Sequence, residues 1–169
     1  MNGNSLRISA EQKVIIFPSL TKSNTEGQVY FLFSLRQVED IIKEVRVESV
    51  PFSLPHIEGI TVWRDRVVPV LSLEKCLGMN HQSNPDVSAG TRLIMVRLLR
   101  EERGRPKEER IMFRVSPSIR MLSLPLQCSP VPVNPCSDIH RPHLLRAFYE
   151  WSEGFLAVIH IGEIFLIEN

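Results

Sequence analysis

The sequence predicts an all-β protein, because its apolar residues occur in short runs rich in Val, Ile and Phe that Pro, Gly, Asn or Ser terminate. Turns separate these runs along most of the 169 residues, and the helix–strand alternation of nucleotide-binding α/β folds is absent. Many short strands with few helices are typical of β-barrels or a sandwich. We therefore expect one compact domain, or two small subdomains that share a core.

Composition narrows the classes of partner. Twenty basic and 19 acidic residues give a net charge of +1, which argues against a general binder of nucleic acid or acidic lipid. No apolar run approaches the length of a membrane span, and the N-terminus lacks the apolar run of a signal peptide. The three cysteines, Cys76, Cys128 and Cys136, include no C-x-x-C pair and cannot all form disulfides within one chain, so we expect reduced thiols. We expect a cytoplasmic protein with a flexible segment 1–12 before one domain, 13–169.

The first strands are expected at Val14–Phe17, which Pro18 ends, and at Gln28–Leu35. In the second strand, apolar residues at every other position place one face against a core. The segment 36–45 fits either a helical stripe or a strand. We expect a helical turn near Leu35–Val38 and then extended chain to Val50.

A hairpin is expected next, with strands Ile60–Trp63 and Arg66–Leu71. Its turn is Arg64-Asp65, since Asp tolerates the left-handed conformation that such turns need. Pro69 cannot donate a ladder hydrogen bond, which predicts an edge strand or a bulge.

A short helix should follow at 73–77, with Ser72 as its N-cap and Gly78 as its end. The second half predicts a hairpin of Arg92–Leu99 and Arg110–Val115 around a charged loop, 100–109, and then a strand at Ile119–Leu124. A proline-rich irregular segment leads to a last hairpin that turns at 152–154 and returns as Phe155–Ile161. A short helix over Gly162–Phe165 completes the elements.

Motifs for catalysis or cofactors are weak. Neither a P-loop nor G-x-G-x-x-G occurs, and Ser72-Leu73-Glu74-Lys75 matches S-x-x-K without a companion K-T-G. Cys136, His140 and His143 have spacings that could bind zinc, so a zinc-dependent hydrolase is the alternative from the enzyme class. Their loop lacks a C-x-x-C anchor, which favours ordinary loop residues. We expect no cofactor, no metal and no catalysis.

Two further features have ordinary structural interpretations. The Arg-rich stretch 97–110 carries interleaved Glu, so a solvated hairpin tip is favoured over a site for an acidic partner. It also lacks aromatic residues for base stacking, which argues against a nucleic-acid module. His160 lies in an apolar run without a Ser or Asp at triad spacing, which favours a hydrogen-bonded structural residue.

The stretch 38–73 resembles the CheW family. The family pattern reads V-x-E-I, then P, then P-x-x-x-G-[VI]-x-x-[LW]-R-G-x-[VI]-[VI]-P-[VI]-x-D-L. Here it is matched by Val38-Glu39-Asp40-Ile41, by Pro51, and by the ungapped segment Pro55–Leu73. Weaker similarity extends over residues 14–166.

The resemblance implies two SH3-like five-stranded β-barrels that share a hydrophobic interior, with one or two short helices. It implies a non-enzymatic adaptor of chemotaxis signalling, a two-component system, that couples methyl-accepting chemoreceptors to a CheA-type histidine kinase. The oligomeric state stays open.

The resemblance also implies a partner surface. In the family, the acidic residue of V-x-E-I pairs with the Arg of L-R-G, and these positions are Asp40 and Arg64 here. We expect a charge-assisted hydrogen bond between them. The expected partner-binding residues are Val38, Asp40, Ile41, Val62, Trp63, Arg64 and Asp65. The four apolar residues of this set could equally belong to the core. If Trp63 is exposed, it would be a natural anchor for a partner.

The chain departs from the family at several positions. Asp65 replaces the Gly after Arg64, and Ser72, Ser116 and His160 stand where the family has acidic residues. These changes alter surface charge and turn chemistry without threatening the fold. A divergent adaptor that lacks the usual kinase contact is therefore the alternative within the family.

Overall fold

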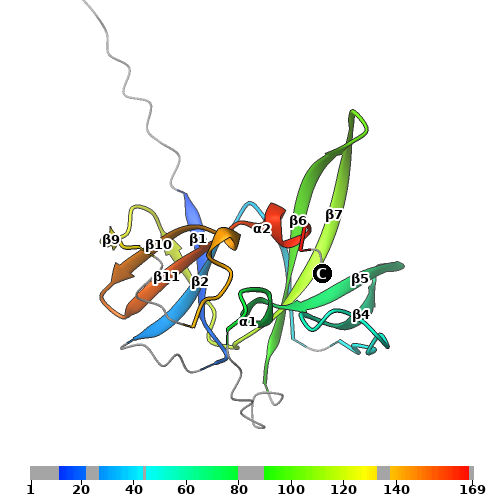
Figure 1. The fold of residues 1–169 in the computed structure, drawn as a ribbon, viewed down its shortest axis with the longest axis horizontal. Helices are drawn as coiled ribbons and strands as arrows, with labels where there is room; N and C mark the ends of the chain where they lie inside the picture. The colour runs from blue at the N-terminus through cyan, green and yellow to red at the C-terminus, as the bar shows by residue number, and fades with distance from the viewer. Residues whose placement is uncertain (1–11, 22–26, 44, 80–89, 133–137, 168–169) are drawn as a thin grey trace, which may run out of the picture.

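A computed structural model describes residues 12–21, 27–43, 45–79, 90–132 and 138–167 (Figure 1). Two sheets dominate it, and the helical elements are short: α1 Leu73–Cys76, the 3-10 helix η2 Pro142–Leu144, and α2 Ile161–Ile164. The all-β prediction is confirmed. Apart from Gln12, the predicted flexible segment 1–12 lies outside the described residues.

The first sheet has the strand order β8-β1-β2-β11-β10-β9. Its strands are β1 Lys13–Pro18, β2 Gln28–Ser34, β8 Arg120–Ser123, β9 Cys128–Pro130, β10 Leu145–Trp151 and β11 Gly154–Ile159. β11 runs parallel to β2, whereas the other neighbours are antiparallel. This sheet has six strands where the family resemblance implied five, because the three-residue β9 pairs with β10.

The second sheet has the order β3-β6-β7-β5-β4. Its strands are β3 Val38–Ile42, β4 Ile57–Trp63, β5 Arg66–Ser72, β6 Arg92–Glu102 and β7 Arg105–Val115. The turn expected near Leu35–Val38 is present ahead of β3, where the Gln37 N–H donates to the Ser34 carbonyl. After β3, Glu48 forms an isolated antiparallel bridge with Ile60.

The interior is shared by the two sheets, as the resemblance implied. Phe17, Phe31 and Phe33 of the first sheet pack in one cluster with Phe113 of the second, and the rings of Phe33 and Phe113 lie 5.6 Å apart. The other face of the second sheet covers a smaller apolar cluster around Met95. Burial of the large cluster holds the two sheets together, because it removes apolar surface of both from water.

Pro69 contradicts the expectation of an edge strand or a bulge. It lies in β5, which is flanked by β4 and β7, and it pairs regularly with Ile60. Pairing of β5 with β7 begins only at Val70, one residue later. Pro69 therefore sits where β5 has not yet gained its second neighbour, so its missing N–H breaks no ladder bond on that side.

The segment 100–109 is also not a loop. β6 and β7 continue through it to a two-residue turn at Arg103 and Gly104, whose φ angles are 53° and 74°. Cross-strand ion pairs explain the extension, since Lys107 pairs with Glu102 and Glu109 at 2.9 and 3.1 Å. We call the part from 97 to 110 the arm; it stands away from the body in Figure 1.

The predicted Ser72 N-cap is confirmed. Its Oγ accepts from the Lys75 N–H at 3.3 Å, as α1 begins, and donates to the Glu74 carboxylate at 3.2 Å. Glu74 is buried and also accepts from the Leu20 N–H at 2.7 Å. The S-x-x-K match is thus part of a helix cap that joins α1 to the loop after β1.

Candidate functional site

The β4–β5 hairpin ends in the predicted turn. Arg64 and Asp65 have φ angles of 45° and 62°, and Trp63 pairs with Arg66 on either side of them. Positive φ at both turn residues matches the right-handed twist of the strands, so β4 and β5 stay paired up to the turn. We call the outer surface of this hairpin, with Ile41 of β3, the hairpin face.

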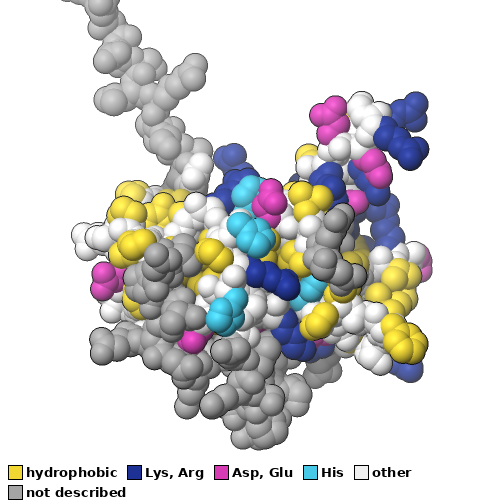
Figure 2. Space-filling view, viewed as in Figure 1, with side chains coloured by type: hydrophobic (Ala, Val, Ile, Leu, Met, Phe, Trp, Pro, Cys, Tyr) yellow, Lys and Arg dark blue, Asp and Glu magenta, His cyan; other side chains and the backbone are white. Residues whose placement is uncertain are grey.

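Two valines face solvent on the hairpin face. Val62 and Val67 are cross-strand partners, and each is 65% exposed. In Figure 2, hydrophobic side chains gather at the side where Figure 1 places the ends of β4 and β5. Val67 was absent from the expected set. Neighbouring strand residues point to opposite faces, and of the Val67-Val68 pair Val68 is buried while Val67 is exposed.

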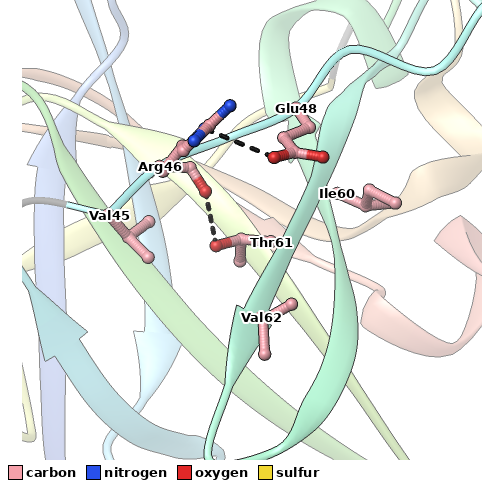
Figure 3. Close-up of a pocket in the computed structure, with 6 residues that line it drawn as sticks. All are labelled: Val45, Arg46, Glu48, Ile60, Thr61 and Val62. Atoms are coloured by element: carbon pink, nitrogen blue, oxygen red, sulfur yellow. Dashed lines mark hydrogen bonds and ion pairs between the residues drawn. The ribbon is translucent and has the colours of Figure 1, made fainter.

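A small groove of about 200 Å³ borders Val62. Figure 3 shows its lining, in which the segment 45–48 runs beside β4. The Thr61 hydroxyl donates to the Arg46 carbonyl at 2.7 Å and Arg46 pairs with Glu48, which fix one wall. Apolar atoms of Val45, Ile60 and Val62 supply the rest of the lining. The groove is large enough for a single apolar side chain of a partner.

The expected apolar residues divide into two groups. Ile41 of β3 is 42% exposed, and Val62 of β4 is 65% exposed. Val38 and Trp63 are partly buried and pack against the core clusters, so the core interpretation holds for them. The Arg64 guanidinium lies 4.1 Å from the centre of the Trp63 ring, which covers the indole further. Trp63 is therefore a support behind the hairpin face and not an exposed anchor.

The expected Asp40–Arg64 hydrogen bond is wrong. Among the described residues these two side chains form no ion pair, and Oδ1 of Asp40 accepts from the Ile41 N–H at 2.8 Å. Glu39 takes the ionic role instead: Nε and Nη2 of Arg110 donate to its two oxygens at 2.6 and 3.2 Å. A bulge between Val38 and Asp40 explains the exchange, because it changes which carboxylate faces β7.

The pKa of Glu39 reflects the positive charges around it. Its hydrogen bond with Arg110 lowers its pKa from the model-compound value of 4.5, and the positive charges of Arg97 and Arg64 act in the same direction. Arg64 and Arg97 form no ion pair with any residue the structure describes. Arg64, Arg97 and Arg110 therefore all act on Glu39, and Arg110 is shared with Glu108.

The residues of the zinc alternative give it no support. Cys136 lies outside the described residues, and His140 and His143 are exposed. Across the described part of the chain, no group of three or more His, Cys, Asp or Glu side chains is placed to hold a metal ion. The histidine prediction is confirmed at His160, whose Nδ1 accepts from the Glu163 N–H at 3.3 Å and caps α2.

Comparison with known families decides the classification. The family model described as the CheW-like domain matches residues 24–124, which is more than half of the chain. The chain belongs to the CheW-like domain family. A search of curated proteins returned no match.

Among solved structures, this CheW-like chain is similar to the scaffolding protein TtCheW from Thermoanaerobacter tengcongensis. The two share 18% identity, the TM-score is 0.64, and the match covers 99% of this chain and 96% of the other. This likeness confirms the predicted fold of two SH3-like barrels. In the described residues, none of the helices is long and apolar enough to span a membrane.

Proposed function

We propose that this CheW-like chain is a non-enzymatic adaptor that couples chemoreceptors to a CheA-type histidine kinase by protein–protein binding. Membership of the CheW-like family supports the class of function. The observation that carries the proposal is the exposed Val62–Val67 pair on the β4–β5 hairpin. Cross-strand valines bury each other's side chains poorly when they face water, and a partner surface would remove both from solvent.

The hairpin face has the composition of a docking surface. Val62, Val67 and Ile41 offer apolar area, and the adjoining groove would accept one partner side chain. Arg64 and Asp65 form a charged rim at the tip, where they would select the orientation of a partner. The fixed turn limits the entropy lost on binding, because the backbone is already ordered.

The remaining expected residues act from behind this surface. Val38 and Trp63 pack against the core clusters and hold β3 and β4 in place. Oδ1 of Asp40 accepts from the Ile41 N–H, so the carboxylate places a negative charge beside Ile41. We therefore assign direct contact to Ile41, Val62, Val67, Arg64 and Asp65, and a positioning role to the other three.

Binding assays with two purified fragments test the proposal: the cytoplasmic tip of a chemoreceptor and the regulatory domain of a CheA-type kinase, both from the source organism. Val62→Asp with Val67→Asp should weaken binding of at least one fragment more than about tenfold, since charges enter an apolar contact. Both residues are exposed, so the fold should persist. Met121→Asp is the matched control, because Met121 is 57% exposed on β8 of the other sheet.

Each result has a defined meaning. Equal effects of the hairpin and Met121 variants would show that the hairpin face is not the contact. Failure of the folded wild-type chain to bind either fragment at tens of micromolar would contradict the adaptor function. Binding of the receptor fragment alone would favour the divergent adaptor without the kinase contact.

A further inference from the structure

Within the described part of the chain, the arm has two edges without a neighbouring strand. On one side, β3 accompanies β6 only as far as the Val38–Val96 pair. On the other side, β5 accompanies β7 only at Val70–Ser72, opposite Met112–Arg114. Beyond these points β6 and β7 pair solely with each other among the described residues, out to Glu102 and Arg105. Each outer edge therefore presents unpaired backbone groups, which can template another strand.

The edge of β6 is the more receptive one. In a two-residue hairpin the residues beside the turn, Glu102 and Arg105, form a hydrogen-bonded pair, so the backbone groups of Leu99 and Glu101 point outward. The bond from the Arg97 N–H to the Gln37 carbonyl, at 2.9 Å, confirms this alternation on β6. At the matching outward position of β7 stands Pro106, which has no N–H to donate.

Side chains on the arm favour an acidic partner. Glu102 pairs with Lys107, Glu109 pairs with Lys107 and Arg100, and Glu108 pairs with Arg110. A smaller set of cations lacks ion pairs with any described residue: Arg97, Arg103 and Arg105. Glu101 is the one acidic residue of the arm that has no ion pair with a described residue. The unpaired arginines therefore outnumber the unpaired acids on the arm.

Leu99 adds an apolar contact to this edge. Its side chain is 69% exposed and lies on the same face of β6 as Arg97, two residues away. A strand paired with this edge would place alternate side chains beside both of them.

We propose that the β6 edge of the arm, from Leu98 to Glu102, binds an extended acidic segment of a partner protein as an added strand. The backbone of Leu99 and Glu101 supplies the hydrogen bonds. Leu99 contacts an apolar residue of that segment, and Arg103 and Arg105, at and beside the turn, attract its carboxylates. This site is separate from the hairpin face and does not depend on the proposed adaptor function.

Other occupants fit these observations less well. A second copy would bring two tips with unpaired Arg103 and Arg105 into the same contact, where like charges repel. Nucleic acid would use aromatic side chains for stacking, and the arm has none between 97 and 110. Both occupants are outcomes that the test can detect.

The test uses the full chain and a synthetic ten-residue peptide that alternates Glu with Val. Binding is followed by fluorescence anisotropy and by amide NMR signals of Leu99 and Glu101. Leu99→Pro removes one outward donor from β6, and Glu108→Pro makes the matched change at its cross-strand partner on the opposite edge. We expect Leu99→Pro to weaken binding about tenfold and Glu108→Pro to leave it within about twofold.

Two more variants separate the backbone from the side chains. Leu99→Thr keeps the N–H and shortens the side chain, so its loss should be smaller than that of Leu99→Pro. Arg103→Asn with Arg105→Gln should weaken binding and reduce its dependence on salt. Asn tolerates the positive φ at position 103. Retained amide signals of Ile111 and Phe113 in every variant show that the sheet is intact.

Several results would overturn the proposal. These are equal affinities for the Leu99→Pro and Glu108→Pro variants, equal binding of a peptide that alternates Lys with Val, and no binding of the Glu–Val peptide by folded protein. Dimerisation that Leu99→Pro abolishes would assign the edge to a second copy. Displacement of the peptide by single-stranded RNA would assign it to nucleic acid. The Val62→Asp with Val67→Asp variant should bind the peptide normally, which separates this site from the hairpin face.

Discussion

Nε of Arg110 in β7 donates a 2.6 Å hydrogen bond to Oε2 of Glu39 in β3, across 71 positions of sequence. This contact fastens β3 to the base of the arm, because the two strands are separated by β6 in the sheet. It also orders the arginine in a two-point geometry with a carboxylate, the strongest arrangement available to that pair. The ion pair beside the hairpin face is thus built from Glu39 and Arg110.

A double-mutant cycle on Glu39→Gln and Arg110→Gln should give a coupling free energy of about 0.5–1 kcal/mol. The corresponding cycle on Asp40→Asn and Arg64→Gln should give a coupling near zero. The pKa of Glu39 is lowered in the folded state, so its stabilisation is present above the unfolded value and is lost as pH falls through the folded value. Urea unfolding at pH 7 and below pH 4.5 measures both; a larger Asp40–Arg64 coupling would contradict the assignment.

Restoring the family's acidic residue at position 72 should destabilise this chain. Ser72 and Glu74 are both buried with 3.2 Å between Oγ and Oε2, so Ser72→Asp places two carboxylates together. We expect a loss of about 2–4 kcal/mol at pH 7 and a smaller loss near pH 4, where the pair can share a proton. Ser72→Asn keeps a cap acceptor and is the control. Equal stability of the two variants at pH 7 would refute the reasoning.

Substitutions at Trp63 and Arg64 should differ in their effect on the free energy of unfolding. Trp63→Ala removes packing from the smaller apolar cluster, and we expect a loss of about 2 kcal/mol in the free energy of unfolding. Arg64→Gln removes an exposed charge and a cation–π contact, with a change of about 0.5 kcal/mol or less. Chemical denaturation measures both changes. The assignment fails if Trp63→Ala leaves stability unchanged.

His56 should make stability depend on pH. Burial lowers its pKa from 6.5, and the positive charge of Arg141 acts in the same direction. The unfolded chain therefore binds a proton that the folded chain resists, so stability falls as pH drops below about 6.5. His56→Asn should reduce the difference in urea midpoint between pH 7.5 and 5.5. The exposed His143→Asn is the control, and an equal effect of both variants would count against His56.

The rate at which the cysteine thiols react should show that Cys76 of α1 is buried. Burial raises the pKa of Cys76 to about 12, with the charge of Glu74 contributing. Cys128 lies in β9 and is partly exposed. In a Cys136→Ser background, one thiol should react rapidly with a disulfide reagent in native buffer, and two in denaturant. Mass spectrometry identifies the modified residue, and rapid labelling of Cys76 in the folded protein would contradict its burial.

Local patterns predicted most strands and turns. Alternation placed Val29, Phe31 and Phe33 inside, and the Arg64-Asp65 turn followed from the conformational tolerance of Asp. At three positions where the family has acids, the hydroxyls of Ser72 and Ser116 and the His160 ring each accept a backbone N–H. Of these acceptors, the Ser72 cap was predicted from the sequence.

The arm and the candidate surfaces were harder to predict. Charged residues from 100 to 109 suggested a loop, because their stabilising partners are cross-strand neighbours that only the β6–β7 register defines. Exposure of Val67 and cover of Trp63 depend likewise on which elements pack behind β4 and β5. The expected Asp40–Arg64 pair failed because a bulge in β3 shifts the carboxylates by one position.

Short-range spacing and alternation encode most of the strands, the Arg64-Asp65 turn, the Ser72 cap and the family resemblance, so these features could be predicted from the sequence. Sheet register and packing are needed to see that Glu39 pairs with Arg110, that Val62 and Val67 both face water, and that no described strand pairs with the outer edge of β6. Glu39 and Arg110 are distant in sequence, and exposure depends on what packs behind a strand, so local patterns do not encode these features.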